Sequence, residues 1–371
     1  MSSEIDEKTE RLVRVCFSEG LAGVLINSQP NFAWMTAGGR NGVDSSRENG
    51  VATLLVRRDG KRFVLANRIE MARIMTEEVN GLNYEPLEFG WEEEKQNPAI
   101  IGKLAQSVMT EAMPLGCDLP LSDAAVIDAA IARERYQLTA SEIVRFKALG
   151  QDAGGAIGTL ARSLSPGLTE REVARRTNEA LGAIGADAVV TLVAADERIQ
   201  RFRHPVPKDV EWKKVLMIVV CARRHGLIAS LTRIVCAGAV PDELSRRTRA
   251  AAQVNALLFN TSKPGVNGRE LYEVAANGYR AEGFSGEEKL HHQGGAAGYR
   301  TRDWVAHPTC ADRVQKNQAF AWNPSITGTK VEETMIAFED HIEVITTTPG
   351  WPSIQIEFGA DTYILPDVLS V

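Results

Sequence analysis

The sequence has few cysteines, and their arrangement indicates neither a disulfide framework nor a zinc site. The five are scattered, odd in number and without C-x-x-C spacing: Cys16, Cys117, Cys221, Cys236 and Cys310. Such usage fits a reducing compartment. No apolar run approaches the ~20 residues that span a bilayer, and the polar, acidic N-terminus lacks the basic and apolar regions of a secretory signal. These absences predict a cytoplasmic protein.

Basic residues are not in excess either, which restricts the partners. The 371-residue chain has a formal net charge of −6, which argues against a general affinity for nucleic acid or membranes. It carries neither a G-x-G-x-x-G run nor a Walker lysine for phosphate binding. With 44% hydrophobic and 24% charged residues it resembles an ordinary globular protein long enough for two domains. We therefore expect a small molecule as its partner.

The first part of the chain alternates helical and strand patterns. Helical periodicity covers residues 8–20, 70–78 and 99–110, and strand-like runs cover 23–26, 51–57 and 62–66, the last two joined at Asp59-Gly60. The alternation predicts an α/β domain with a mixed sheet. The pattern breaks near residue 137, where Thr139 and Glu142 form a capping box that opens a long helix. We place a domain boundary there.

Two features organise the second part. The β-rich runs 215–222 and 227–235 flank a polar turn and predict an apolar antiparallel hairpin, in which Ser230 and Thr232 face one way and Leu231 and Arg233 the other. A buried sheet of this kind aims a few polar groups into a pocket. In addition, the segment 166–172 (PGLTERE) recurs as 264–270 (PGVNGRE), each copy opening an amphipathic helix. This indicates either a duplication or merely a common helix start.

These segments resemble the pita-bread fold family of creatinase, aminopeptidase P, prolidase and methionine aminopeptidase. The hairpin resembles the family's D-x-G, turn, G-Y-x-x-D-x-T-R frame, residues 290–302 resemble G-H-G-x-G-x-x-x-H-E, residues 322–324 resemble the E-P step, and residues 328–336 resemble G-x-R-x-E-D-T-x-L. The resemblance implies an α/β (α+β) chain, with a creatinase-like N-terminal domain over residues 1–137 and a C-terminal pita-bread domain over 138–371.

The resemblance fails where the family holds two metal ions. Four ligand positions carry other residues, namely Val219, Ser230, Gly295 and Asn323, and only Glu332 keeps an acidic ligand. One carboxylate and a serine cannot offset the dehydration of two divalent ions. We predict no metal and no other cofactor.

Several other residues acquire roles from the same resemblance. His204, next to Arg203, stands where creatinase has its proton-transferring histidine, although it could also be a surface histidine before a proline-rich loop. Arg302 replaces a histidine that contacts substrate, and its planar, charged fork suits a carboxylate. Arg47, or alternatively Arg40, lies on a glycine-rich loop resembling the one that reaches the neighbouring subunit's substrate in creatinase. That role requires a homodimer.

The leading hypothesis is a metal-independent, creatinase-like hydrolase that acts on a C–N bond of a small, anionic molecule. His204 transfers the proton, Glu332 orients or activates water, and Asn323 and Thr232 bind the scissile group. Substrate-binding candidates are Arg302, Arg47, Arg203, Arg233 and Ser230. Creatine itself is not expected, because both creatinase glutamates are replaced.

Two alternatives stay open. The chain could be an inactive module that binds a peptide or small ligand, as histone-chaperone relatives of the fold do. It could also be an Xaa-Pro peptidase-like metallohydrolase with rearranged ligands drawn from His291, His292, Glu332 and His307. A covalent mechanism through Ser230 or Cys221 has no G-x-S-x-G signature to mark it.

Overall fold

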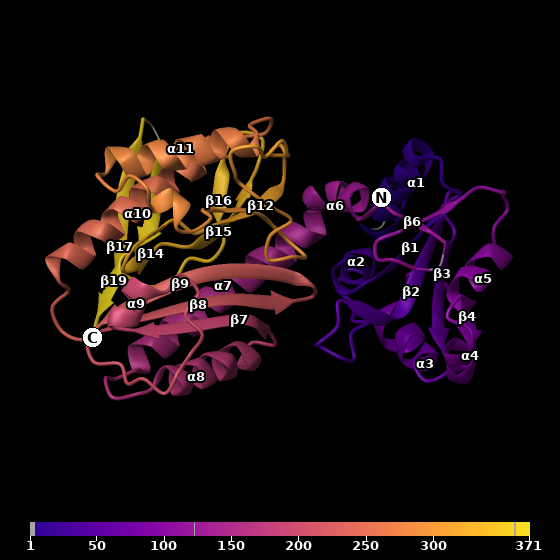
Figure 1. Ribbon diagram of the computed structural model, residues 1–371, viewed down its shortest axis with the longest axis horizontal. Helices are drawn as coiled ribbons and strands as arrows, with labels where there is room; N and C mark the ends of the chain where they lie inside the picture. Colours follow the sequence, from indigo (N-terminus) through magenta and orange to yellow (C-terminus); the bar gives the residue numbers. More distant parts are fainter. Residues whose placement is uncertain (1–3, 122, 360) are drawn as a thin grey trace. The chain divides into compact units, whose positions relative to one another are not determined.

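Figure 1 shows the computed structural model, in which residues 4–121, 123–359 and 361–371 are described. The chain divides into two compact units, Met1–Arg135 and Tyr136–Val371. Among the described residues, no helix combines the length and apolar character needed to cross a membrane. Each unit has its own β-structure and its own buried core: one sheet in the first unit and several in the second.

The first unit is built on one mixed, six-stranded sheet in the order β4-β3-β2-β1-β5-β6. Its strands are β1 (Gly23–Ser28), β2 (Asn49–Arg57), β3 (Arg62–Asn67), β4 (Glu85–Phe89), β5 (Leu115–Cys117) and β6 (Ala125–Val126). Its helices are α1 (Glu4–Glu19), α2 (Gln29–Met35), α3 (Met71–Arg73) with the π-helical turn Ile74–Glu78, α4 (Trp91–Gln96), α5 (Ile100–Ser107) and α6 (Asp128–Tyr136). Since β1 is antiparallel to β2 and parallel to β5, the predicted mixed α/β sheet is confirmed.

The central strand β1 explains why helices cover both faces of this sheet. Val24, Leu25 and Ile26 are all buried, although neighbouring side chains of a strand point to opposite faces. Leu25 belongs to an apolar cluster that packs against α5, and α1 and α2 contact β1 and β2. A strand that is apolar on both faces needs a helical layer on each side.

The second unit consists of two halves, each of which begins with two helices and continues with strands. The first half comprises α7 (Ala140–Ser163), α8 (Glu170–Ala183), β7 (Asp187–Ala195), α9 (Glu197–Arg201), β8 (Val215–Arg224) and β9 (Leu227–Cys236). The second comprises α10 (Asp242–Thr261), α11 (Gly268–Ala281), the 3₁₀ turn Glu287–Lys289, β10 (Gly294–Ala297), β11 (Trp304–Val305), β12 (Gln318–Trp322), β13 (Ser325–Ile326), β14 (Thr329–Lys330), β15 (Glu333–Ala337) and β16 (Ile342–Val344). The hairpin of β17 (Ser353–Phe358) and β18 (Asp361–Pro366) and the strand β19 (Val368–Ser370) follow. The sheets are ordered β19-β9-β8-β7 and β11-β10-β12-β15-β16.

Matching backbone hydrogen bonds show that the repeated PG segment is a structural repeat. The Gly167 N–H donates to Trp212 O at 2.8 Å, and the Gly265 N–H donates to Val314 O at 2.9 Å. Both glycines have a positive φ, 96° and 95°, at equivalent positions. Each copy also forms an isolated antiparallel bridge at the same place, Thr169 with Glu211 and Asn267 with Arg313, which a common helix start alone would not explain. The duplication is therefore the better explanation of the pattern.

The predicted hairpin is formed by β8 and β9, and its turn is tighter than expected. Only His225 and Gly226 lie between the strands, and both have positive φ, 51° and 78°, as in a type I′ turn. The strand register places Val219 opposite Thr232 and Cys221 opposite Ser230. Directly paired residues share one face of a sheet, so these four side chains lie on the same side.

The opposite face of this sheet is covered by α7 and α8 (Figure 1). Arg233 points to that side, as predicted, where its guanidinium donates to Thr348 Oγ1 and to Thr346 O, each at 2.8 Å. The face that carries Thr232 is left to the segments arriving from the second half. The Thr232 N–H donates to Glu332 O, and the Ser230 N–H donates to Thr334 Oγ1.

Candidate functional site

A cavity of about 300 Å³ lies in the second unit, on the Thr232 face of β8 and β9. The first half supplies an apolar floor from β7 and β8, and the second half supplies most of the polar side chains. The lining residues are Val190, Leu192, His204, Val219, Cys221, His292, Thr301, Arg302, Asn323, Lys330 and Glu332. Four predicted site residues, His204, Arg302, Asn323 and Glu332, are therefore brought together at one cavity.

Glu332 is the centre of the polar network. It is 2% exposed. Its Oε2 accepts a hydrogen bond from the Thr232 hydroxyl at 2.7 Å and forms an ion pair with Lys330 Nζ at 3.3 Å. Its Oε1 accepts a hydrogen bond from Arg302 Nη2 at 3.3 Å. Burial by itself would raise the pKa of Glu332, but Lys330 and Arg302 outweigh it, so that the pKa is lowered. At neutral pH this carboxylate is ionised and both of its oxygens are engaged.

Lys330 is a site residue that the sequence analysis did not select. Its side chain is 5% exposed and lines the cavity beside Glu332. The signal was present, because Lys330 occupies the arginine position of the quoted G-x-R-x-E-D-T-x-L segment. It lies two residues before Glu332, at the end of β14.

The charged groups of the cavity do not balance. Arg302 and Lys330 contribute two positive charges, and Glu332 contributes one negative charge. A cavity with an excess of positive charge favours binding of an anion, because the anion neutralises the remaining positive charge. An arginine guanidinium can in addition bind a carboxylate through two parallel hydrogen bonds.

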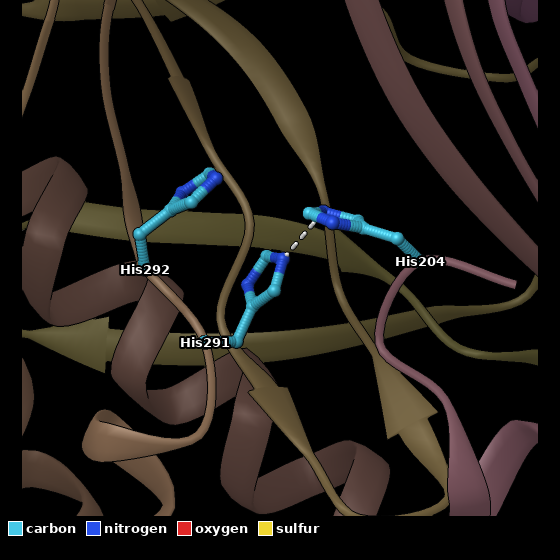
Figure 2. Close-up of side chains that lie close together, drawn as sticks. All are labelled: His204, His291 and His292. Carbon is cyan, nitrogen blue, oxygen red and sulfur yellow. Dashed lines mark hydrogen bonds between the residues drawn. The ribbon is translucent and has the colours of Figure 1, made fainter.

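Three histidines gather at the same place, and Figure 2 shows them with their rings turned toward one another. His204 lies after α9, and His291 and His292 precede β10. The Nε2 atoms of His204 and His291 are 2.9 Å apart, and the rings of His291 and His292 are stacked with centroids 4.4 Å apart. Burial lowers the pKa of all three, to about 2 for His291 and about 4 for His292, with Lys330 or Arg302 acting in the same direction. All three are neutral at pH 7.

Asn323 offers an acceptor without a partner. It follows β12, is 3% exposed and lines the cavity, and its Oδ1 makes no hydrogen bond within the described part of the chain. A buried polar atom of this kind costs free energy unless a ligand or water satisfies it. Asn323 can therefore accept a hydrogen bond from a donor group of a bound molecule.

The two nucleophile candidates, Ser230 and Cys221, contact each other rather than a base. The Ser230 hydroxyl donates to Cys221 Sγ at 3.3 Å. Burial, together with the charge of Glu332, raises the pKa of the Cys221 thiol. A thiol without an adjacent general base is not an activated nucleophile. The arrangement favours a structural contact at the cavity wall.

The remaining arginine candidates do not line the cavity. Arg233 is buried and forms an ion pair with Glu333 at 2.8 Å. Arg203 pairs with Glu287 and donates to Thr327 Oγ1. Both residues orient segments that carry site residues, and their donors are already used.

Arg47 and Arg40 lie in the first unit. Arg47 is exposed and forms an ion pair with Asp44 at 3.2 Å. The backbone N–H of Arg40 donates to Glu78. His307, the remaining candidate for a rearranged metal site, is exposed, and its Nδ1 accepts from the Thr309 N–H rather than joining the other histidines.

Taken together, the duplicated halves and the cavity between their sheets define a protein of the pita-bread fold. Solved structures of this class superimpose on nearly the whole chain. The prolidase from Thermococcus sibiricus matches with a TM-score of 0.79 at 16% identity, over 100% of both chains. The Xaa-Pro dipeptidase from Bacillus anthracis matches with 0.75 at 18% identity, over 99% of this chain and 100% of that one.

A sequence model of metallopeptidase family M24 matches residues 145–348, more than half of the chain, and the chain belongs to this family. A search of the curated proteins finds no match. A further structure, the N-terminal domain of FACT complex subunit SPT16 from Cicer arietinum, matches with a TM-score of 0.66 at 11% identity, over 93% of this chain and 97% of that one.

The family name implies a metal, and the resemblance to creatinase and prolidase motifs implies a dinuclear centre, but the residues present do not fit one. Val219 is apolar, and the Ser230 hydroxyl is engaged with Cys221. At Gly295, even a Cβ atom would lie 2.0 Å from Trp304 O, so a histidine cannot occupy this position without a shift of the backbone. Glu332 is the only acidic residue left at a ligand position, and its negative charge already compensates the positive charges of Lys330 and Arg302.

Proposed function

We propose that the second unit is a metal-independent hydrolase acting on a C–N bond of a small, anionic molecule. The observation that carries the proposal is the excess of positive charge: the half-buried Arg302 and the buried Lys330 face one carboxylate, Glu332, at the wall of a cavity that His204 also lines. A guest with a carboxylate group supplies the missing negative charge. Membership in a peptidase family supports a hydrolytic reaction.

Proton transfer is assigned to His204, because its neutral imidazole can accept a proton. As the oxygen of a water molecule forms a bond with the carbon of the C–N group, His204 takes the proton from the water. It returns the proton to the nitrogen as the C–N bond breaks, and the products are a hydroxylated or carbonyl compound and an amine. Asn323 binds a donor group of the substrate through its free oxygen.

Glu332 then acts mainly by position. Its two oxygens hold Arg302 and Lys330 at the cavity wall, and Thr232 fixes the carboxylate in turn. Glu332 was expected to orient or activate water; we propose instead that it holds the two cations in place, because both of its oxygens are engaged. Ser230, Arg203 and Arg233 support neighbouring segments, and Arg47 is assigned to the site of a neighbouring subunit.

The test begins with binding. Purified protein is screened by thermal shift against small carboxylated metabolites with amide, guanidino or amino groups. We expect a hit that raises the melting temperature of the wild type and of Arg249→Gln, an exposed arginine on α10, but not that of Arg302→Gln. A hit that shifts Arg302→Gln as much as the wild type would contradict the assignment of the anion site.

Turnover is tested next on the compound found. We expect mass spectrometry to show two hydrolysis products with the wild type, in the presence of a chelator as well as without it. The variant His204→Gln should lose about 10²–10⁴-fold in rate, the usual contribution of general acid–base catalysis. Turnover that disappears with chelator would overturn metal independence.

The second candidate is a binding module without catalysis. It is favoured by the saturation of Glu332, which leaves the cavity no carboxylate free to activate water. Binding of the same compound without any product, in both wild type and His204→Gln, would establish this function instead.

A further inference from the structure

We propose that His204, His291 and His292 form a binding site for one divalent transition-metal ion, at a place different from the family's ligand positions. The three residues come from both halves of the second unit, one from the segment after α9 and two from the segment before β10 (Figure 2). None of the three occupies a position at which the family resemblance places a metal ligand.

The distances carry the inference. One nitrogen from each ring lies within 4.8 Å of the other two, and the Nε2 atoms of His204 and His291 are 2.9 Å apart. Zn²⁺ binds imidazole nitrogen at about 2.0–2.1 Å with tetrahedral angles, which places neighbouring ligand atoms about 3.3 Å from each other. The His204–His291 separation is slightly shorter than this value and no separation in the cluster exceeds it by more than about 1.5 Å, so ring rotations can bring the three nitrogens to one ion.

The ring orientations show which side chain has to move. His204 meets His291 edge to face, at an interplanar angle of 73°, whereas His291 and His292 are stacked at 26°. Nearly parallel rings cannot point their lone pairs at one ion. His292 is the more exposed of the two and is therefore the ring that can rotate, whereas His291 is 8% exposed.

The cluster is chemically incomplete without a further partner. His291 Nδ1 is buried and forms no hydrogen bond with any described residue. No carboxylate is hydrogen-bonded to any of the three rings within the described residues, and the Nε2 atoms of His204 and His291 face each other. Neutral imidazole nitrogens in such an arrangement suit zinc, copper, nickel or cobalt rather than magnesium or calcium.

The surrounding charges determine what else binds with the ion. Arg302 and Lys330 repel a dication, and Glu332 attracts it, as their effects on the pKa of His204 indicate. Three histidines leave one position of a tetrahedral ion open for water or an anion. An anion in that position would also contact the positively charged wall, so metal and anion should bind more tightly together than either alone.

A metal ion held by His204 takes the lone pair that the proposed hydrolysis needs. The ion therefore acts as an inhibitor of that reaction. This consequence rests on the proposed function, whereas the metal site itself does not.

The experiment uses the full chain, treated with chelator and dialysed, and Zn²⁺ or Co²⁺ alone as the probe. Binding is measured by titration calorimetry and by the visible absorption of tetrahedral Co²⁺. We expect one ion per chain, a loss of affinity of at least about 100-fold in each of His204→Gln, His291→Gln and His292→Gln, and no change in His341→Gln, an exposed histidine elsewhere in the second unit. Arg302→Gln should bind the ion more tightly.

Two results would overturn the site. One is wild-type binding no tighter than that of the triple histidine variant. The other is retention of wild-type affinity by His292→Gln, whose exposed side chain can be replaced without loss of folding, as circular dichroism can verify. If metal binds as expected but does not inhibit a demonstrated hydrolysis, the site stands and the role of His204 in the proposed function fails.

Discussion

At the scale of single residues, the site depends on one carboxylate that compensates two cations. Glu332 and Lys330 are buried, Arg302 is half-buried, and the two ion pairs of Glu332 are 3.3 Å long. Removing one partner of a buried ion pair leaves uncompensated charge in a medium of low polarity. The carboxylate is therefore expected to matter for stability as well as for binding.

This leads to a prediction for Glu332→Gln. The substitution should lower the free energy of unfolding by about 3–5 kcal/mol, measured by urea denaturation at pH 7. The double variant Glu332→Gln/Lys330→Met, which removes one of the two unpaired cations, should regain part of the loss. The exposed pair of Glu339 with Lys316 is a matched control, and Glu339→Gln should cost less than about 1 kcal/mol. An unchanged stability of Glu332→Gln would show that the cations are solvated.

Which site residues could be predicted from the sequence also differs residue by residue. Glu332, Asn323 and Arg302 were found because they fall on motif positions. Lys330 falls on one as well but was not selected, because a lysine two residues from an acid is common on any strand. His291 and His292 are off the motif positions, and only their distance to His204 reveals them.

At the scale of elements, the repeat appears in the way the second helix of each half begins. In each half, a capped helix follows the PG segment: Thr169 accepts from the Glu172 N–H at the start of α8, and Asn267 accepts from the Glu270 N–H at the start of α11. The hydroxyl and amide oxygens satisfy backbone donors that have no partner in the first helical turn.

The equivalence of the two caps is testable. Thr169→Ala and Asn267→Ala should each reduce the free energy of unfolding by about 1 kcal/mol, and the effects should add in the double variant, because the residues lie in separate halves and share no hydrogen-bond partner. Thr169→Ser, which keeps the hydroxyl, is the control. A loss in one half only would mean that the two starts are not energetically equivalent, in spite of their shared geometry.

The hairpin between β8 and β9 was the element most fully predicted. Its alternation correctly assigned Thr232 to one face and Arg233 to the other, because the side-chain period of a strand is fixed by its backbone. The sequence could not predict which residues contact each face of the hairpin. Thr232 meets Glu332, which is distant along the chain, and this contact exists only because the two half-sheets pack together.

At the scale of the whole molecule, the role proposed for Arg47 requires an assembly of at least two chains. Arg47 is exposed on the loop before β2 and pairs only with Asp44, another exposed residue, among the ion pairs of the described chain. We propose that this arginine contributes to the site of a second copy. The chain should then sediment as a dimer of 40.5 kDa subunits.

A mixing experiment tests this assignment directly. Arg47→Gln and His204→Gln are each expected to be impaired in the proposed hydrolysis, and mixed dimers should regain part of the activity, since one of their two sites then has both residues intact. Arg40→Gln is the control for the rival arginine. A monomer in sedimentation, or no regain of activity after verified exchange of subunits, would contradict the role of Arg47.

The sequence by itself determined the class of fold and the absence of the family's metal ligands. Both are written in short-range patterns: apolar alternation, a repeated helix start and the residue types at motif positions. The tertiary structure decided which polar groups meet. Arg302 meets Glu332 between distant segments of one half, and His291 meets His204 between the two halves. Such contacts follow from the packing of whole sheets, and no local pattern encodes the distance between side chains that are far apart in the chain.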